Sequence, residues 1–230
     1  MKTRRRSTEA IIEEQVRKWT LLSKENKRKP FEPAVAISRL PGSGGDQIAQ
    51  KLADHLGFDF FDAEIIHKVA ENARLSSACI HTLDEKGISW VENWVLALRN
   101  ERYLWRGEFI RQLANVIGVI GKHGRAVILG RGASFILPPA ECLRVLVVAP
   151  LDVRIENVKK ELSVSAEEAK QRVITTESER KAYIRQYFHA EFLDPIQYDL
   201  VLNTAYMNPD ASLGTIEAAW NAKKNLRKGS

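Results

Sequence analysis

A glycine-rich loop, Ser38 to Gly45, carries the residues of this chain that are best suited to bind a phosphate group. It follows a short apolar run, Ala34 to Ile37, and precedes a stretch with apolar residues at helical spacing, 48–56. A loop between a strand and a helix gathers backbone N–H groups at the helix N-terminus, where the helix dipole favours an anion. The loop therefore predicts phosphate binding, and a tight strand-to-helix turn without further function is the alternative.

The loop departs from the P-loop pattern G-x-x-x-x-G-K-[ST], whose lysine contacts the β- and γ-phosphates and whose hydroxyl binds magnesium. With Gly44 as the last loop glycine, Gly45 takes the lysine position and Asp46 takes the hydroxyl position. Arg39 stands where the first glycine is expected. Its guanidinium could supply part of the missing positive charge, or form an ion pair with Asp46 or Asp62. Asp46 would repel a triphosphate unless it binds a magnesium ion.

Short apolar runs that alternate with amphipathic stretches place this loop in an α/β fold, with a parallel sheet covered by helices on both faces. The expected strands are 35–37, 58–62, 126–129, 143–149 and 199–202. The expected helices are 7–23, 45–56, 63–73, a mainly helical insertion 75–104, 107–123, 151–162, 165–188 and 210–224. Ligands of such folds bind at the carboxyl ends of the strands. These ends are Ser38-Arg39, Asp62, Gly130-Arg131, Pro150 and Asn203-Thr204.

The composition is that of an ordinary globular protein of 230 residues, with 44% hydrophobic and 28% charged residues. The two cysteines, Cys79 and Cys142, lie in apolar surroundings and are expected to be reduced and buried. We find neither an apolar run long enough for a transmembrane helix nor the apolar core of a secretory signal. The sequence therefore predicts a cytoplasmic protein without a membrane partner.

The net charge of +6 raises the question of nucleic-acid binding. Much of the excess lies in two terminal segments, Arg4 to Arg6 and Lys223 to Lys228, which we expect to be solvated tails. A basic surplus also suits a pocket for a polyphosphate. Nucleic acid is therefore not an expected partner.

Several spaced motifs, read together, resemble the cytidylate kinase-like family of P-loop proteins. The motifs are ISRLPGSGGDQIAQKLADHLGFDFFDAEII, VILGRGASFIL, LRVLVVAPLDVRI, the TESER run at Thr176 to Arg180, and YDLVLNT at Tyr198 to Thr204. The resemblance implies a nucleoside-monophosphate-kinase-like three-layer fold with a five-stranded parallel sheet. The apolar spacing over 7–23, before the first strand, and the charged, proline-containing stretch that follows it predict an N-terminal helical extension and linker over 1–30, which the resemblance does not cover. The kinase-like domain would extend over 31–230. Within that domain, 75–105 would be the acceptor side and 163–190 an arginine-bearing lid.

The function implied by the resemblance is ATP-dependent phosphoryl transfer, with Mg²⁺ arriving on the nucleotide. The acceptor would be a nucleotide or another phosphorylated small molecule. The alternative is a kinase-like fold with little or no catalysis, acting as a nucleotide-sensing or protein-interaction module. The N-terminal helix would pack either on the main body or on a second subunit, so a homodimer stays open.

The resemblance also assigns roles to individual residues. The donor phosphates would be bound by Arg39, Gly42, Ser43, Gly44, Gly45, Asp46 and Gln47. The acceptor side would use Asp62, Lys68 and Arg131, and catalysis would use Arg131, Arg180 and Arg185. Lys68 could instead be an ordinary exposed lysine, and Arg154 is either a further phosphate ligand or a solvated residue facing Glu156 or Glu161. No set of residues predicts a metal site made by the protein alone.

The chain departs from the family pattern beside two of these residues. Gly132 follows Arg131, where cytidylate kinases have an acid that helps to read cytosine, and Ala63 follows Asp62, where an arginine is usual. The resemblance therefore does not carry base specificity over to this chain.

Overall fold

A computed structural model describes residues 8–25, 32–101 and 108–226 of the chain. Its strands are separated by single helices or by runs of helices, as the apolar periodicity predicts. In chain order the elements are α1 (Thr8–Glu25), β1 (Ala34–Arg39), α2 (Gly45–Leu56), β2 (Asp59–Phe61), α3 (Ala63–Glu71), α4 (Ala73–Ile80), α5 (Glu85–Glu101), α6 (Glu108–His123), β3 (Ala126–Leu129), α7 (Ala133–Ile136), β4 (Cys142–Val148), α8 (Leu151–Leu162), α9 (Ala166–Phe188), the 3-10 helix η1 (Pro195–Gln197), β5 (Leu200–Asn203) and α10 (Pro209–Leu226).

The sheet consists of five parallel strands in the order β2-β3-β1-β4-β5, which confirms the expected five-stranded parallel sheet. β1 is central: it pairs with β3 through Val35 and Val127, and with β4 through Val35 and Leu143. A crevice at the carboxyl end of such a central strand is where ligands bind in open α/β sheets. The glycine loop starts at this point.

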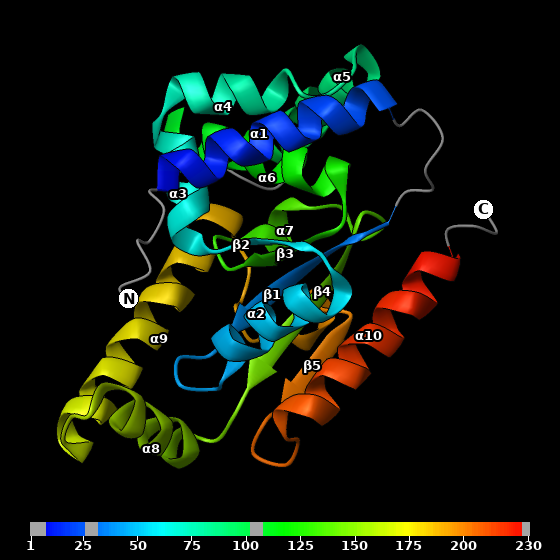
Figure 1. Cartoon of the computed structure of the whole chain (residues 1–230). Helices are drawn as coiled ribbons and strands as arrows, with labels where there is room; N and C mark the ends of the chain where they lie inside the picture. The colour runs from blue at the N-terminus through cyan, green and yellow to red at the C-terminus, as the bar shows by residue number, and fades with distance from the viewer. Residues whose placement is uncertain (1–7, 26–31, 102–107, 227–230) are drawn as a thin grey trace, which may run out of the picture.

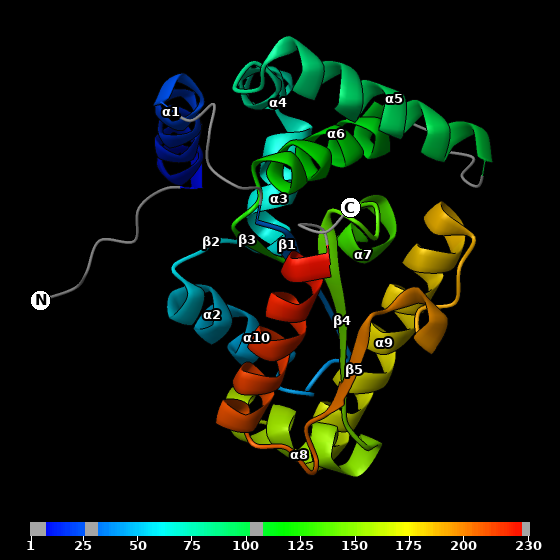
Figure 2. The same cartoon turned by 90° about the vertical axis from the view of Figure 1, so that its right-hand side faces the viewer.

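Helices cover both faces of the sheet, which makes the fold three-layered (Figures 1 and 2). Successive side chains of β1 point to opposite faces, because the side-chain period of a strand is two residues. Val35 and Ile37 pack in a core with residues of α2 and α10, while Ala34 and Ala36 pack in a core with residues of α6, α7 and α9. The continuous apolar run of β1 is therefore explained by burial on both faces.

The helix boundaries follow the signals in the sequence. The Asp62 side chain caps α3 by accepting hydrogen bonds from the N–H groups of Glu64 and Ile65, at 2.9 and 2.8 Å. Gly57 ends α2 in the left-handed conformation, with φ 63°, and the Ser165 hydroxyl caps α9. These three predicted ends are confirmed.

The tryptophans of the helical insertion pack into the protein, as their spacing predicts. Trp90 and Trp94 lie against the core, Leu98 is buried, and the Trp94 Nε1–H donates a hydrogen bond of 2.6 Å to the Ile136 carbonyl. The insertion consists of α4 and α5 within its described residues, and Trp105 lies outside them. α9 runs from Ala166 to Phe188 without a break.

The prediction that Lys223 to Lys228 form a solvated tail is wrong for the first two lysines. Lys223 forms an ion pair with Asp199, and Lys224 forms one with Glu32. Both lysines lie in the last turn of α10, which these pairs attach to the edge of the sheet and to the segment before β1. Residues 227–230 and Arg4 to Arg6 lie outside the described part of the chain.

The N-terminal helix α1 packs on the main body, one of the two arrangements that its pattern allowed. Trp19 is buried and stacks on His123, with 4.5 Å between the ring centroids, and on Phe61, with 5.7 Å. The Gln15 amide donates a hydrogen bond of 2.8 Å to the Asp59 carboxylate at the start of β2. Six residues of the predicted linker, 26–31, lie outside the described residues.

Acid should weaken the fold through His123, because burial lowers the pKa of this imidazole from 6.5 to about 4. Between these two pH values the unfolded chain binds a proton at His123 that the folded protein does not bind. The free energy of unfolding therefore falls as the pH falls. From pH 7 to pH 5 we expect a loss of about 2 kcal/mol in the free energy of unfolding from this group. Urea unfolding at both pH values measures it. His123→Gln should remove most of the loss, and an equal loss in that variant would contradict the assignment.

Candidate functional site

The glycine loop has a backbone that only glycine adopts without strain at two of its positions. Gly42 and Gly44 have φ of 76° and 75°, and a Cβ added to Gly42 would lie 2.4 Å from the carbonyl oxygen of Arg154. Two side chains from other elements fix the loop: Asn157 of α8 donates to the Gly42 carbonyl at 2.9 Å, and the Thr204 hydroxyl donates to the Ser43 carbonyl at 2.8 Å. The loop is therefore preformed.

A large pocket opens beside the loop, and we call it the loop pocket. Its volume is about 820 Å³, within the range of about 300–1,000 Å³ typical of small-molecule sites. Its walls are the loop and the start of α2, one face of α8, and the segment after β5. The lining residues are Gly42, Ser43, Gly44, Asp46, Gln47, Ile48, Asn157, Lys160, Glu161, Thr204, Ala205, Tyr206, Met207, Asn208 and Pro209.

An ion pair closes one side of the loop. The Arg39 Nη2 lies 2.7 Å from an Asp46 carboxylate oxygen, and its Nε–H donates to both carboxylate oxygens at 3.2 and 3.3 Å. Burial alone would raise the pKa of Asp46, but the hydrogen bonds from Arg39 and the charges of Arg39 and Arg180 lower it below its usual value. Of the two partners considered for Arg39, the structure selects Asp46.

A second cavity, of about 320 Å³, is lined by Arg39, and we call it the arginine cavity. It gathers three guanidinium-bearing residues from three elements that are distant in sequence. Its lining residues are Ser38, Arg39, Ala63, Gly130, Arg131, Gly132, Glu179, Arg180, Tyr183, Ile184 and Phe192. Such a concentration of positive charge is suited to a phosphate ester.

Arg131 has the left-handed conformation, with φ 52°, although it is not a glycine. Its neighbours Gly130 and Gly132 share this conformation. A strained non-glycine residue at the end of a buried strand is typical of a functional site. The Arg131 Nε–H donates to the Ala63 carbonyl at 3.1 Å, which ties the side chain to the start of α3.

Arg180 lines the arginine cavity and is held against the backbone of Arg39. Its Nη1 donates a hydrogen bond of 2.7 Å to the Arg39 carbonyl. Burial and the charge of Arg39 lower the pKa of Arg180 to about 10, against the opposing effect of Asp46. The guanidinium therefore stays protonated at neutral pH. Arg39, Arg131 and Arg180 together form the positive end of the site.

Four of the residues expected at the site do not line either cavity. The Asp62 carboxylate is engaged in capping α3, and Lys68 forms an exposed ion pair with Glu64 on the same helix. Arg185 is exposed and pairs with Glu191, 3.2 Å away. Gly45 is buried against Arg39 rather than lining the loop pocket.

Arg154, the weaker candidate, is a buried residue in a network within the protein. It is 5% exposed and pairs with Glu177 of α9 at 2.9 Å, not with Glu156 or Glu161. Its Nε–H also donates to the Ala149 carbonyl at 2.9 Å. The guanidinium thus connects α8 to α9.

Several lining residues were missed by the sequence analysis, although helical spacing points to some of them. Tyr183 lies three residues after Arg180 on α9, so both side chains share one face of the helix. Asn157 and Lys160 have the same spacing on α8, where they line the loop pocket. The segment 205–209 follows Thr204, whose position at a strand end was the available signal.

The hydroxyl of Tyr183 is buried in the arginine cavity and has no hydrogen-bond partner among the described residues. Burial raises the pKa of this phenol to about 12, although the charge of Arg131 lowers it. Without a ligand, Tyr183→Phe should therefore raise the free energy of unfolding by about 1 kcal/mol, because a desolvated hydroxyl is removed. The same variant should bind a phosphate ester in this cavity about fivefold more weakly. Urea unfolding and titration with a phosphate ester test both effects, and a destabilised variant would contradict this role.

Comparison with known proteins identifies the family of this chain. The model of the cytidylate kinase-like family matches residues 34–206. The chain belongs to this family. The match begins at β1 and includes the glycine loop and all residues named as lining the arginine cavity. It leaves out α1, which precedes the matched region.

Among the relatives of this family member is the cytidylate kinase of Ignicoccus hospitalis, 28% identical over 184 residues, which span 80% of this chain and 96% of the relative. The cytidylate kinase of Pyrococcus horikoshii is 28% identical over 186 residues, or 80% of this chain and 86% of the relative. A crystal structure of an uncharacterized protein from Eubacterium ventriosum has the same fold, with a TM-score of 0.59 and 20% identity, over 83% of this chain and 99% of that chain.

Two further observations concern the cysteines and the hydrophobicity of the helices. Cys79 and Cys142 are free and buried, as expected, and burial raises the pKa of each thiol to about 12. None of the helices described by the structure is long and apolar enough to cross a membrane.

Proposed function

We propose that this protein transfers the γ-phosphoryl group of ATP to a phosphorylated small molecule of the nucleoside-monophosphate class. The observation that carries the proposal is the pair of cavities that meet at Arg39 and Asp46, one beside a glycine loop and one lined by three arginines. A phosphotransferase needs two adjacent sites of this kind, because donor and acceptor must be held in line. The reduced, buried cysteines support a cytoplasmic location.

The loop pocket would hold the donor. Glycines at 42 and 44 leave the backbone open to phosphate oxygens, and the dipole of α2 favours negative charge at its N-terminus. Lys160 of α8 also lines this pocket. The loop lacks the P-loop lysine, so Arg39 and Arg180 would have to supply positive charge near the phosphates.

The arginine cavity would hold the phosphate of the acceptor. Arg131 and Arg180 can donate hydrogen bonds to its oxygens and stabilise the charge that spreads over the transferring group. No nucleophile from the protein is required, since an oxygen of the acceptor's own phosphate attacks the donor. The protein contributes position and charge.

Magnesium fits this site only as a partner of the nucleotide. The described residues contain no cluster of three or more His, Cys, Asp or Glu side chains that could hold a metal ion by themselves. Asp46 lines the loop pocket, and its side chain is 58% exposed despite its pairing with Arg39. A carboxylate and phosphate oxygens are ligands that Mg²⁺ prefers, so Asp46 would contribute one ligand. The ion would neutralise phosphate charge when bound.

The acceptor would be selected mainly through its phosphate. Cytidylate kinases among the relatives make a nucleoside monophosphate the first acceptor to test. The position after Arg131 has no room for a base-reading acid, because a Cβ on Gly132 would lie 2.4 Å from the Phe188 ring. Glu179 and Tyr183 are the polar groups that remain to contact the rest of the acceptor.

A thermal-shift panel of ATP, ADP and nucleoside monophosphates, each with and without Mg²⁺, tests the proposal. A ligand that binds the folded state raises the melting temperature by mass action. We expect a shift with Mg²⁺-ATP, a smaller shift with free ATP, and a shift with at least one monophosphate. In Asp46→Asn the difference between free ATP and Mg²⁺-ATP should shrink. No shift with any nucleotide at millimolar concentration would refute the proposal.

The second candidate, a kinase-like module with little or no turnover, rests on the same pair of residues. Asp46 already neutralises Arg39, so the loop offers less net positive charge than a loop with a free lysine. This candidate predicts nucleotide binding in the panel without ADP release in a coupled assay. Turnover that disappears in Arg180→Ala would exclude it.

A further inference from the structure

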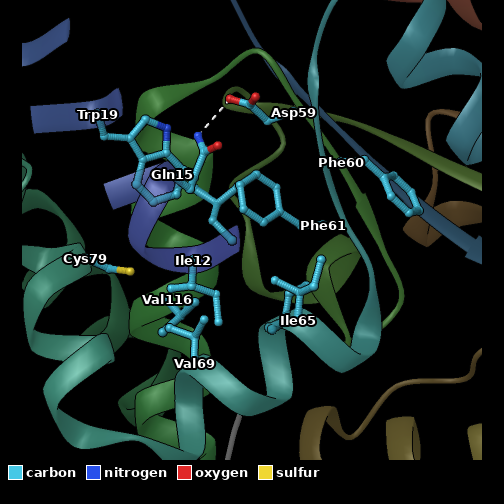
Figure 3. Close-up of a pocket in the computed structure, with 12 residues that line it drawn as sticks. Ile12, Gln15, Trp19, Asp59, Phe60, Phe61, Ile65, Val69, Cys79 and Val116 are labelled. Atoms are coloured by element: carbon cyan, nitrogen blue, oxygen red, sulfur yellow. Dashed lines mark hydrogen bonds between the residues drawn. The ribbon is translucent and has the colours of Figure 1, made fainter. Parts of the chain in front are cut away.

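A third pocket lies under α1, away from both cavities of the kinase site, and we call it the α1 pocket. Its volume is about 210 Å³. It is enclosed by α1 on one side and by β2, α3, α4 and α6 on the other (Figure 3). The lining residues are Ile12, Gln15, Trp19, Asp59, Phe60, Phe61, Ile65, Ile66, Val69, Cys79, Val116 and Ile120. None of them lines the loop pocket or the arginine cavity.

The pocket exists because the buried stripe of α1 is interrupted. Ile12 and Trp19, 3% and 4% exposed, are seven residues apart and anchor the helix on the body. Val16, at i+4 from Ile12, packs against the core, but the i+3 position of the stripe is polar. That position is Gln15, whose amide turns to the Asp59 carboxylate and donates a hydrogen bond to it (Figure 3). The space between the two anchors is left open.

The residues that line the α1 pocket indicate which kind of molecule would fit it. Ten of the twelve lining residues are apolar or carry only a thiol, and the one carboxylate, Asp59, is already paired with Lys18, so a charged ligand would lose its hydration without a free counter-charge. The walls include the rings of Trp19 and Phe61, which suits a flat aromatic molecule. An apolar cavity of about 150 Å³ binds benzene in another protein, so 210 Å³ admits a two-ring molecule.

The Asp59 carboxylate in the lining of the pocket adds a requirement for the ligand. The Asp59 carboxylate accepts one hydrogen bond from Gln15 and one from Lys18. An ionised carboxylate has about four lone-pair sites, so it can accept a further hydrogen bond from a ligand. An ionised carboxylate has no hydrogen to donate, so the ligand must supply the donor group.

We propose that the α1 pocket binds a small uncharged aromatic molecule of about the size of indole, with one N–H or O–H group that donates to Asp59. The floor of the pocket includes Ile65, Ile66 and Val69 of α3. The first residue of α3, Ala63, holds Arg131 through its carbonyl, so the pocket and the arginine cavity share this helix. The proposal itself does not depend on phosphoryl transfer.

Calorimetric titration of the full chain with indole and with 1-methylindole tests the site. We expect indole to bind with a dissociation constant below about 1 mM. 1-Methylindole has no donor and should bind about tenfold more weakly, because a hydrogen bond to a charged group is lost. In Gln15→Leu, the new side chain fills the space, so indole binding should fall at least tenfold while the melting temperature stays equal or rises.

Glu13→Leu is the matched control, because it also adds a leucine to α1 but at an exposed position. It should bind indole as the unchanged protein does. The proposal is overturned if indole gives no heat up to its solubility limit, or if Gln15→Leu binds it as tightly as Glu13→Leu. Equal affinities for indole and 1-methylindole would contradict the role of Asp59.

Discussion

Replacing Arg180 with alanine is expected to lower kcat for phosphoryl transfer about 10³-fold. Arg180 lines the arginine cavity and is held by the Arg39 carbonyl, next to the Arg39–Asp46 ion pair that connects this cavity to the loop pocket. Its charge would be close to the equatorial oxygens of the transferring group, where the transition state carries more spread negative charge than the substrates. The affinity for ATP should change much less, because the loop backbone remains. Steady-state kinetics with a coupled ADP-release assay measures both.

Arg185→Ala is the matched control on the same helix. Arg185 is exposed, and its partner Glu191 is exposed as well, so its loss should change kcat less than about threefold. Equal losses in the two variants would contradict the placement of the active centre. Arg185 was expected at this centre from the sequence, so the comparison also decides between that expectation and the geometry.

Replacing Arg154 with methionine is expected to lower the free energy of unfolding by about 3 kcal/mol. The guanidinium is buried, pairs with Glu177 and donates to the Ala149 carbonyl. Methionine fills a similar volume but leaves the Glu177 carboxylate and this carbonyl with fewer partners. Lys181 stays paired with Glu177, which keeps the cost at the lower end of the range for broken buried pairs. Urea unfolding at pH 7 gives the value.

Arg172→Met provides the control, because Arg172 pairs with Glu168 on the exposed face of α9. An exposed pair at i,i+4 contributes about 0.3–0.5 kcal/mol, so this variant should be nearly as stable as the parent protein. If Arg154→Met were equally mild, Arg154 would be better described as a mobile ligand of the phosphates than as a link between α8 and α9.

Much of the fold could be predicted from the sequence, because the apolar periods are strong and the end signals are local. The run Ala34 to Ile37 is apolar at every position, which only a strand buried on both faces requires. Asp62 and Gly57 act within one turn of their own helices, so their roles can be recognised without the tertiary structure. The strand order was not predictable in this way, since it depends on contacts between distant segments.

The site could be predicted only in part, because some of its features depend on contacts between distant segments. The glycine loop and Arg131 are marked by glycines at strand ends, where the backbone itself is unusual. Lys68 and Arg185 carry the right charge and fit the family pattern, but both are exposed and paired with neighbouring acids. Tyr183 was missed because a tyrosine on a long helix has no local signal for a buried, unpaired hydroxyl.

The preference of Arg39 for Asp46 also depends on the tertiary structure. The sequence leaves Asp46 and Asp62 as equal partners, both close to the loop. In the structure Asp62 caps α3, whereas Asp46 lies in the first turn of α2 and pairs with the guanidinium. The close packing of Gly45 on the Arg39 side chain brings the two together.

The most direct test of the central claim is ³¹P NMR of a reaction that contains the protein, Mg²⁺-ATP and a panel of nucleoside monophosphates. We expect the γ-phosphate signal of ATP to decrease while ADP and one acceptor diphosphate form in equal amounts, and we expect this conversion to be about 10³-fold slower with Arg180→Ala. Formation of inorganic phosphate alone, or no change in any signal over many hours at high protein concentration, would contradict the claim that this protein transfers a phosphoryl group between the two cavities.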